Sequence, residues 1–322
     1  MRDTDYAYCV ARLRAVEGTL LKKEDYDRLL SFESLEEAEK LLVEKRWIEC
    51  KSDEIRDYLS AQKDSLWKLL YESVPDKKEL DILCVINDYF NVKAAVKCLV
   101  TGVSPENYLV MPTTLDLNLI KDKLCERDFT RLFSDKGETA EKAYNTAVKS
   151  ENGQSAEIII DKAAIDSMAH FAKNSDNRIL SKINSFFCDS ANIKIAFRCA
   201  LTGKNKAFVE EAIGDCCSIS RERLIEETLN GYDSLTEYLL STAYKNGAEA
   251  FLKSGADFEK WCDERIIAIS SEARYTAFSF SPVCNFYYKK LTEIKNVGII
   301  LTALKNGADM DSIKERLGGI SV

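Results

Sequence analysis

Eleven cysteines and one histidine, His170, are the residues in this 322-residue chain best suited to act as nucleophiles, bases or metal ligands. No Cys-x-x-Cys occurs, and the only adjacent thiols are Cys216 and Cys217, so the spacing does not predict a zinc site. Asp166 stands four residues before His170, which predicts only an ordinary helix-surface pair. We therefore expect no catalytic site and no metal, and we expect most thiols to be buried core residues.

Nucleotide and nucleic-acid binding also lack sequence support. Neither G-x-x-x-x-G-K-[ST] nor G-x-G-x-x-G occurs, so we expect no direct nucleotide binding and no cofactor. The net charge of −8 argues against a phosphate-backbone ligand. No apolar run approaches the length of a membrane span, and Met1 is followed by Arg2 and Asp3, unlike a signal peptide. These features predict a soluble cytosolic protein with reduced thiols that works by binding.

One polar motif, an acid followed three residues later by asparagine, recurs along the chain: Asp88 with Asn91, Asp189 with Asn192, and Glu293 with Asn296. This spacing places the carboxylate and the amide on the same face of a helix. Such pairs are more often structural than functional, because buried polar groups must find hydrogen-bond partners. We therefore expect each pair to tie its helix to a neighbour within the same unit.

Each asparagine opens a segment that aligns with the other two without a gap: NVKAAVKCLVTG, NIKIAFRCALTG and NVGIILTALKNG. Apolar residues recur at i, i+3, i+4 and i+7, which predicts one buried helical stripe in three copies. Phe197 and Leu301 occupy the same stripe position and should both be buried. Each segment ends in a glycine expected to adopt a left-handed C-cap: Gly102, Gly203 and Gly307. We expect the three helices to begin near their asparagines.

The wider pattern predicts an all-α protein of three similar helical domains in a pseudo-threefold arrangement. With 13 glycines, 4 prolines and no long alternating apolar run, strands are not expected. An S-x-x-E capping box, expected to start a helix, occurs at Ser34 and again at Ser234. A period of about 100 residues exceeds that of TPR or HEAT repeats. We place the domains at residues 1–108, 109–214 and 215–322, with the borders near 104–111 and 214–220.

The three segments, the N-terminal run YAYCVARLRAVEGTLLKKEDYDRLLSFESLEEAEKLL and the C-terminal run FSPVCNFYYKKLTEIKNVGIIL resemble the C subunit of prokaryotic V/A-type ATPases and the related d subunit of eukaryotic vacuolar ATPases. The resemblance implies a funnel on the cytoplasmic face of the membrane proteolipid ring. It also implies that the D and F subunits of the central stalk dock into this funnel, and that one copy is present per complex. The funnel would have no active site of its own.

Such a protein would pass rotation between stalk and ring, for ATP-driven ion transport or for ATP synthesis. The resemblance places the ion ligands in membrane subunits, so this chain does not distinguish proton from sodium transport. A helical scaffold or adaptor that binds other soluble proteins is the alternative function. The two differ in membrane association, because only the rotary component should co-purify with a proteolipid ring.

Two pairs of cations on the repeated helices, Lys93 with Lys97 and Lys194 with Arg198, are candidate contacts for a partner. The i, i+4 spacing puts each pair on one helix face, where it could meet acidic residues of the stalk. A solvated helix face balanced by nearby acids is the alternative. In the family resembled, the asparagine is usually followed by an apolar residue and then Lys or Arg. The third copy departs from this pattern, because it has Gly298 in place of the cation.

Overall fold

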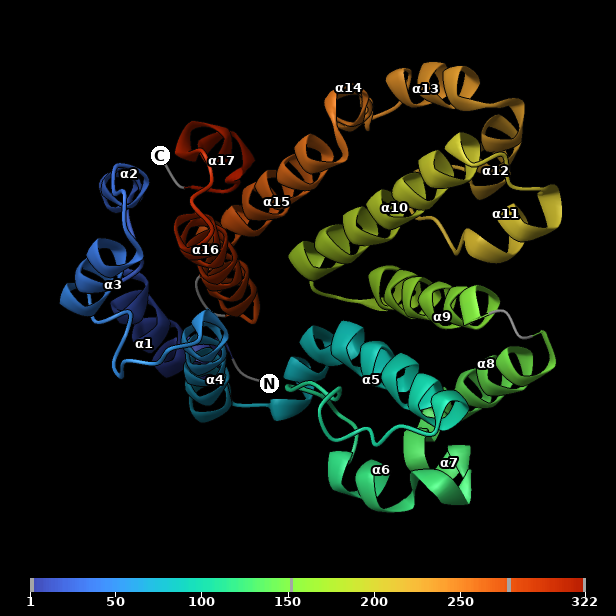
Figure 1. Ribbon diagram of the computed structural model, residues 1–322, viewed down its shortest axis with the longest axis horizontal. Helices are drawn as coiled ribbons and strands as arrows, with labels where there is room; N and C mark the ends of the chain where they lie inside the picture. Colours follow the sequence, from blue (N-terminus) through green and yellow to red (C-terminus); the bar gives the residue numbers. More distant parts are fainter. Residues whose placement is uncertain (1–2, 151–152, 277–278, 321–322) are drawn as a thin grey trace. The chain divides into compact units, whose positions relative to one another are not determined.

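The computed structural model describes residues 3–150, 153–276 and 279–320, and every regular element within these ranges is a helix (Figure 1). The predicted all-α fold class is confirmed. The chain divides into two compact units, one made of Met1–Asp76 with Ala243–Val322 and the other of Lys77–Thr242. Within the described ranges, no helix is both long enough and apolar enough to cross a membrane.

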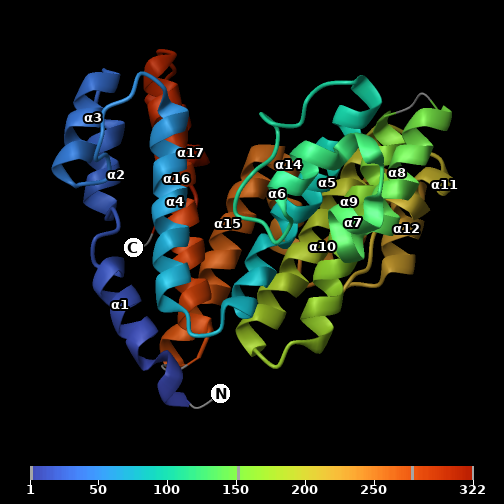
Figure 2. The same ribbon diagram turned by 90° about the horizontal axis from the view of Figure 1, so that it is seen from below.

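The first unit joins the two ends of the sequence through a shared helical core. Its α-helices are α1 (Ala7–Glu17), α2 (Lys23–Leu30), α3 (Leu35–Glu44), α4 (Ile55–Ser73), α14 (Lys245–Lys253), α15 (Gly255–Ser271), α16 (Ser281–Lys305) and α17 (Met310–Arg316). Helix α16 packs against α1, α3, α4 and α15, and Figure 2 shows α4 and α16 side by side. One apolar cluster, which includes Leu42, Tyr58 and Val297, joins the N-terminal helices to α16.

The second unit is continuous in sequence. Its α-helices are α5 (Asp81–Thr101), α6 (Leu117–Lys123), α7 (Phe129–Phe133), α8 (Gly137–Ser150), α9 (Gly153–Asn174), α10 (Arg178–Leu201), α11 (Lys206–Ala212), α12 (Arg221–Asn230) and α13 (Tyr232–Leu240). Helix α5 packs against α8 and α9, whereas α10 packs against α9, α12 and α13. Val92, Phe133 and Ile160 are members of its apolar core.

The helices that carry the three asparagines, α5, α10 and α16, are longer than the sequence alignment indicated. Asn91, Asn192 and Asn296 lie deep inside them, and each helix begins several turns earlier. The expectation that these helices begin near the asparagines was therefore wrong. The upstream turns also bury apolar residues, such as Ile183 and Phe286, which the aligned segments did not include.

The C-terminal ends of the three helices agree with the prediction. Gly102, Gly203 and Gly307 have φ angles of 72°, 59° and 63°, in the left-handed region that residues with a Cβ rarely adopt. The first three positions of each predicted stripe are buried, whereas the fourth position is half-buried in all three copies, at Leu99, Ala200 and Leu304. Phe197 and Leu301 have no exposed surface, and the Phe197 ring lies 5.4 Å from that of Tyr232 between centroids.

Of the two predicted capping boxes, one caps a helix and the other does not. The Ser34 hydroxyl accepts a hydrogen bond from the Glu37 amide at 3.3 Å, at the start of α3. Ser234 instead lies inside α13, and its hydroxyl donates to the Glu227 carboxylate at 2.6 Å. The prediction at Ser234 was wrong because a nearby acid on α12 takes up the hydroxyl.

Each helix that carries an asparagine packs against helices of another copy, and the domain prediction did not include this packing. Helix α5 of the first copy packs on α8 and α9 of the second, and α10 of the second copy packs on α12 and α13 of the third. Helix α16 of the third copy packs on α1, α3 and α4 of the first. The two compact units therefore cut the sequence at places other than the predicted borders 108/109 and 214/215. The division into three domains remains a prediction.

Candidate functional site

In the first copy, the acid–asparagine pair binds the backbone of the segment that connects α5 to α6. Asn91 exchanges two hydrogen bonds with Val110, because its amide donates to the Val110 carbonyl at 2.9 Å and its side-chain oxygen accepts from the Val110 amide at 2.7 Å. Asp88 accepts from the Thr114 amide at 2.8 Å and from its hydroxyl at 2.5 Å. We call such a pair, with its hydrogen bonds, a clamp. The first clamp consists of Asp88 and Asn91.

The second clamp, Asp189 with Asn192, repeats this arrangement on the segment between α11 and α12. The Asn192 side-chain oxygen accepts from the Gly214 amide at 2.9 Å, and its amide donates to the Asp215 carbonyl at 3.0 Å. Asp189 accepts from the backbone amides of Cys217 and Ser218, both at 2.8 Å. The bound segment coincides with the residues predicted as a border, 214–220, so the structure shows a clamped connecting segment there.

The third clamp, Glu293 with Asn296, differs in what its acid binds. Asn296 donates to the Gly318 carbonyl at 2.8 Å, as expected for a copy that binds the segment after its helix. Glu293 instead accepts from the Leu21 amide at 2.6 Å and from the Trp47 indole N–H at 2.8 Å. These donors lie in the N-terminal part of the chain. The third clamp therefore joins the first and last segments of the sequence.

Burial makes the clamps structurally important. The three asparagines are at most 1% exposed, and the three acids are at most 4% exposed. A carboxylate in this environment is stabilised only by donors that replace its water, and here backbone amides, threonine hydroxyls and the Trp47 indole N–H supply them. Lys136 lies 3.7 Å from Asp88, and Lys290 pairs with Glu293. The polar motif that recurs in the sequence thus has a structural role in all three copies.

The cations predicted as partner contacts lie on α5 and α10 in different settings. Lys93 forms an ion pair with Asp161, and Lys97 lies 2.6 Å from the Glu157 carboxylate, so both lysines bridge α5 to α9. On α10, Lys194 is half-buried and Arg198 is exposed. The first pair of cations therefore has acidic partners within its own unit.

The chemistry of the other candidate residues is modest. His170 is exposed and contacts Asn174, whereas Asp166 pairs with Lys162 at 2.6 Å. Seven of the eleven cysteines are buried, which agrees with the prediction that most thiols are core residues. Among the residues that the structure describes, no three His, Cys, Asp or Glu side chains gather to form a metal site.

Two adjacent thiols beside the second clamp differ in acidity. A hydrogen bond between the thiols of Cys188 and Cys217 lowers the pKa of Cys217 to about 7. Burial raises the pKa of Cys216 to about 12. A thiol reacts as its thiolate, so Cys217 should be the more reactive of the two near neutral pH.

We expect iodoacetamide to modify Cys217 at a rate that rises as pH passes through about 7. Cys216, with the higher pKa, should stay slow across this range. Mass spectrometry of the folded Cys216→Ser and Cys217→Ser variants, labelled briefly at a series of pH values, separates the two sites. Equal rates in the two variants at pH 7 would contradict the assignment, and because the residues are adjacent, each serves as the control for the other.

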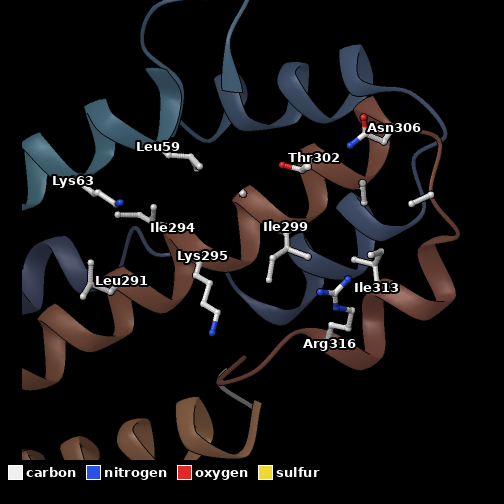
Figure 3. Close-up of a pocket in the computed structure, with 13 residues that line it drawn as sticks. Leu59, Lys63, Leu291, Ile294, Lys295, Ile299, Thr302, Asn306, Ile313 and Arg316 are labelled. Atoms are coloured by element: carbon white, nitrogen blue, oxygen red, sulfur yellow. The ribbon is translucent and has the colours of Figure 1, made fainter. Parts of the chain in front are cut away.

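A groove with a volume of about 720 Å³ lies between α4, α16 and α17 and was not identified from the sequence (Figure 3). Gly298 lies in its wall, at the position that Lys93 and Lys194 occupy in the other copies. The loss of the cation at this position was visible in the sequence, but the opening beside it depends on which helix packs there.

Comparison with known proteins gives a consistent result along the chain. Residues 9–316 match the family described as ATP synthase (C/AC39) subunit. The C subunit of the V-type sodium ATPase of Enterococcus hirae is 20% identical, and the alignment covers 95% of this chain and 95% of the relative. The C subunit of the A-type ATP synthase of Pyrococcus furiosus is 23% identical, with coverage of 99% and 91% respectively.

Proposed function

This chain belongs to the ATP synthase (C/AC39) subunit family, and from that premise we propose that it connects the central stalk of a rotary ATPase to the membrane ring. The observation that carries this proposal is the extent of the match, from residue 9 to residue 316. Both relatives are matched over at least 91% of their own lengths, so the relationship concerns whole subunits. The chain is therefore a non-catalytic subunit of a V/A-type ATPase complex.

In the proposed assembly, the D and F subunits of the central stalk bind one side of this protein and the proteolipid ring binds another. One copy would be present per complex, held peripherally at the cytoplasmic face of the membrane. ATP hydrolysis in other subunits would turn the stalk, and this protein would pass the rotation to the ring. In a synthase, the rotation would pass in the opposite direction.

The clamps support a role in passing force. A protein that transmits torque must resist sliding of its helices and unwinding of its connecting segments. Each long asparagine helix is fastened to a non-helical segment by hydrogen bonds of its buried asparagine, for example α5 at Val110 and α10 at Gly214. Buried hydrogen bonds are costly to break, because the freed groups are not solvated. Connecting segments that would otherwise be flexible are therefore held to rigid helices.

Purification of the native assembly through an affinity tag on this chain tests the proposal. We expect mass spectrometry to identify the proteolipid, the D and F subunits of the stalk, and the catalytic head subunits. The same tag on an unrelated protein serves as the control. Recovery with soluble proteins alone, without a proteolipid, would support the scaffold alternative instead.

We expect binding of the isolated D–F pair to weaken as salt rises to about 1 M, where the screening length is roughly 3 Å. Reversal of charge in Lys194→Glu/Arg198→Glu should weaken it further, with little change in melting temperature, if these cations face the stalk. Lys93→Glu/Lys97→Glu should also break the pairs with Asp161 and Glu157. Such exposed pairs contribute only about 0–1 kcal/mol to stability.

Calorimetric titration of D–F into each variant provides the measurement. The Lys142→Glu/Lys149→Glu variant reverses the same number of charges at two exposed lysines of α8, so it is the matched control. Affinity that is independent of salt would exclude an electrostatic contact. Equal affinity of the Lys194→Glu/Arg198→Glu variant and the control would show that Lys194 and Arg198 lie on a solvated face.

A further inference from the structure

The groove between α4, α16 and α17 has an apolar lining. Leu59 of α4, Ile299 of α16 and Ile313 of α17 line it (Figure 3). Leu59 and Ile299 are only partly buried in the unit, so they still expose apolar surface in the groove. Exposed apolar surface that is gathered in a concave site is typical of a binding surface.

Cations surround this apolar lining. Lys63, Lys295 and Arg316 line the groove, and its thirteen lining residues include no acid. Lys295 pairs with Asp263, whereas neither Lys63 nor Arg316 forms an ion pair with another described residue. The whole chain carries a net charge of −8, so a positively charged rim is opposite in sign to the protein as a whole. An occupant of the groove should therefore carry negative charge at its edges.

Comparison of the copies explains why the groove is open in this unit. In the first copy, the seam between α5 and α9 is bridged by the Lys93–Asp161 ion pair. In the seam between α16 and α4, the residue that corresponds to Lys93 is Gly298, and it faces Leu59. A Cβ at Gly298 would lie 3.0 Å from a Leu59 methyl carbon, so the backbone approaches Leu59 closely and no side chain from this position extends over the surface.

The length of the groove limits what can fill it. Its lining residues on α16 run from Leu291 to Asn306. At a rise of 1.5 Å per residue, this stretch is about 22 Å long, or four helical turns. A partner helix laid along the groove would present apolar residues at i, i+3, i+4 and i+7 to its lining. A compact small molecule would cover only part of this length.

We propose that this groove binds an amphipathic helix of a partner protein, whose apolar face meets the lining and whose acidic flanks meet Lys63 and Arg316. This proposal depends only on the groove. In addition to the proposed rotary function, it names the kind of partner segment that the groove would bind. The complex could assemble through other surfaces if this groove were empty. Peptide binding and co-purification with the ring therefore test separate claims.

The test uses a labelled peptide of about 16 residues, made of leucine, alanine and glutamate, with leucine on one helical face and glutamate on its flanks. Fluorescence anisotropy with the full chain should show affinity at least about tenfold higher than for two controls. One control has the same composition in scrambled order, and the other has lysine in place of glutamate. The first tests the apolar face, and the second tests the charge.

Three variants locate the site. Lys63→Glu/Arg316→Glu should weaken binding of the acidic peptide at least about tenfold, and Thr302→Trp, which fills the groove, should do the same. Lys314→Glu is the matched control, because Lys314 is exposed on α17 and does not line the groove. It should bind the peptide as the unmodified chain does. Melting curves show whether each variant is folded.

Several results would overturn the inference. Equal binding of the scrambled peptide would exclude a helical face, and unchanged binding by both groove variants would place the peptide elsewhere. Binding of phosphatidylglycerol–phosphatidylcholine vesicles through Lys63 and Arg316, without binding of the peptide, would assign the groove to a membrane surface. A dimer in sedimentation velocity that Thr302→Trp abolishes would assign it to a second copy of this chain.

Discussion

Replacing Phe197 with alanine is expected to lower the free energy of unfolding by about 3–5 kcal/mol. The ring has no exposed surface and packs against Tyr232, so its removal leaves a cavity in the second unit. Leu301→Ala removes the equivalent side chain from the core of the first unit and should cost about 2–5 kcal/mol. The two substitutions test whether the repeated stripe stabilises both units in the same way.

Denaturant unfolding, followed by circular dichroism, provides the measurement. Leu201→Ala is the matched control, because Leu201 is 62% exposed at the end of the helix that carries Phe197. It should change the unfolding free energy by about 0.5 kcal/mol or less. A Phe197→Ala or Leu301→Ala variant that unfolds like the unmodified chain would contradict the burial of the stripe.

The second large effect is expected at Glu293, the acid of the third clamp. Glu293→Ala removes the acceptor for the Leu21 amide and the Trp47 indole N–H, and it leaves the Lys290 ammonium without its carboxylate. Breaking a buried, charged hydrogen-bond network in this way costs about 3–5 kcal/mol. Because the lost contacts join the two ends of the sequence, limited proteolysis should also release the N-terminal segment earlier.

Two control variants make this prediction specific. Glu293→Gln keeps an oxygen acceptor for Trp47 but loses the charge, so its effect should be smaller than that of alanine. Glu315→Ala removes an exposed acid from α17 and should have little effect. Two results would show that the third clamp does not hold the ends of the chain together. One is a melting temperature of Glu293→Ala equal to that of the Glu315→Ala control, and the other is unchanged proteolysis of the N-terminal segment.

The clamps show how one sequence motif acquires different partners. The acids of the first two clamps bind segments that follow them, at Thr114 and at Cys217. The acid of the third clamp binds Leu21, 272 residues away along the chain. Glutamate at this position is one methylene longer than the aspartates of the other copies, which gives the carboxylate more reach. The change from Asp to Glu thus accompanies the change of partner.

Local physics determined the features that could be read from the sequence alone. A period of 3.6 residues identified the buried stripes, because a helix exposes the same face every third or fourth residue. The left-handed φ at Gly102, Gly203 and Gly307 follows from the absence of a Cβ. The all-α fold class and the family resemblance rest on such local patterns and on their order along the chain.

Only the tertiary structure decided which elements these patterns meet. The packing of α16 on α4, the pairing of Lys93 with Asp161 and the hydrogen bond from Leu21 to Glu293 all join residues far apart in sequence. Periodicity carries no information about such partners, since a buried face or a charged side chain can be satisfied by many neighbours. The same limit explains why Ser234 was wrongly interpreted and why the groove beside Gly298 was not predicted. Both features depend on the helix that packs next to them.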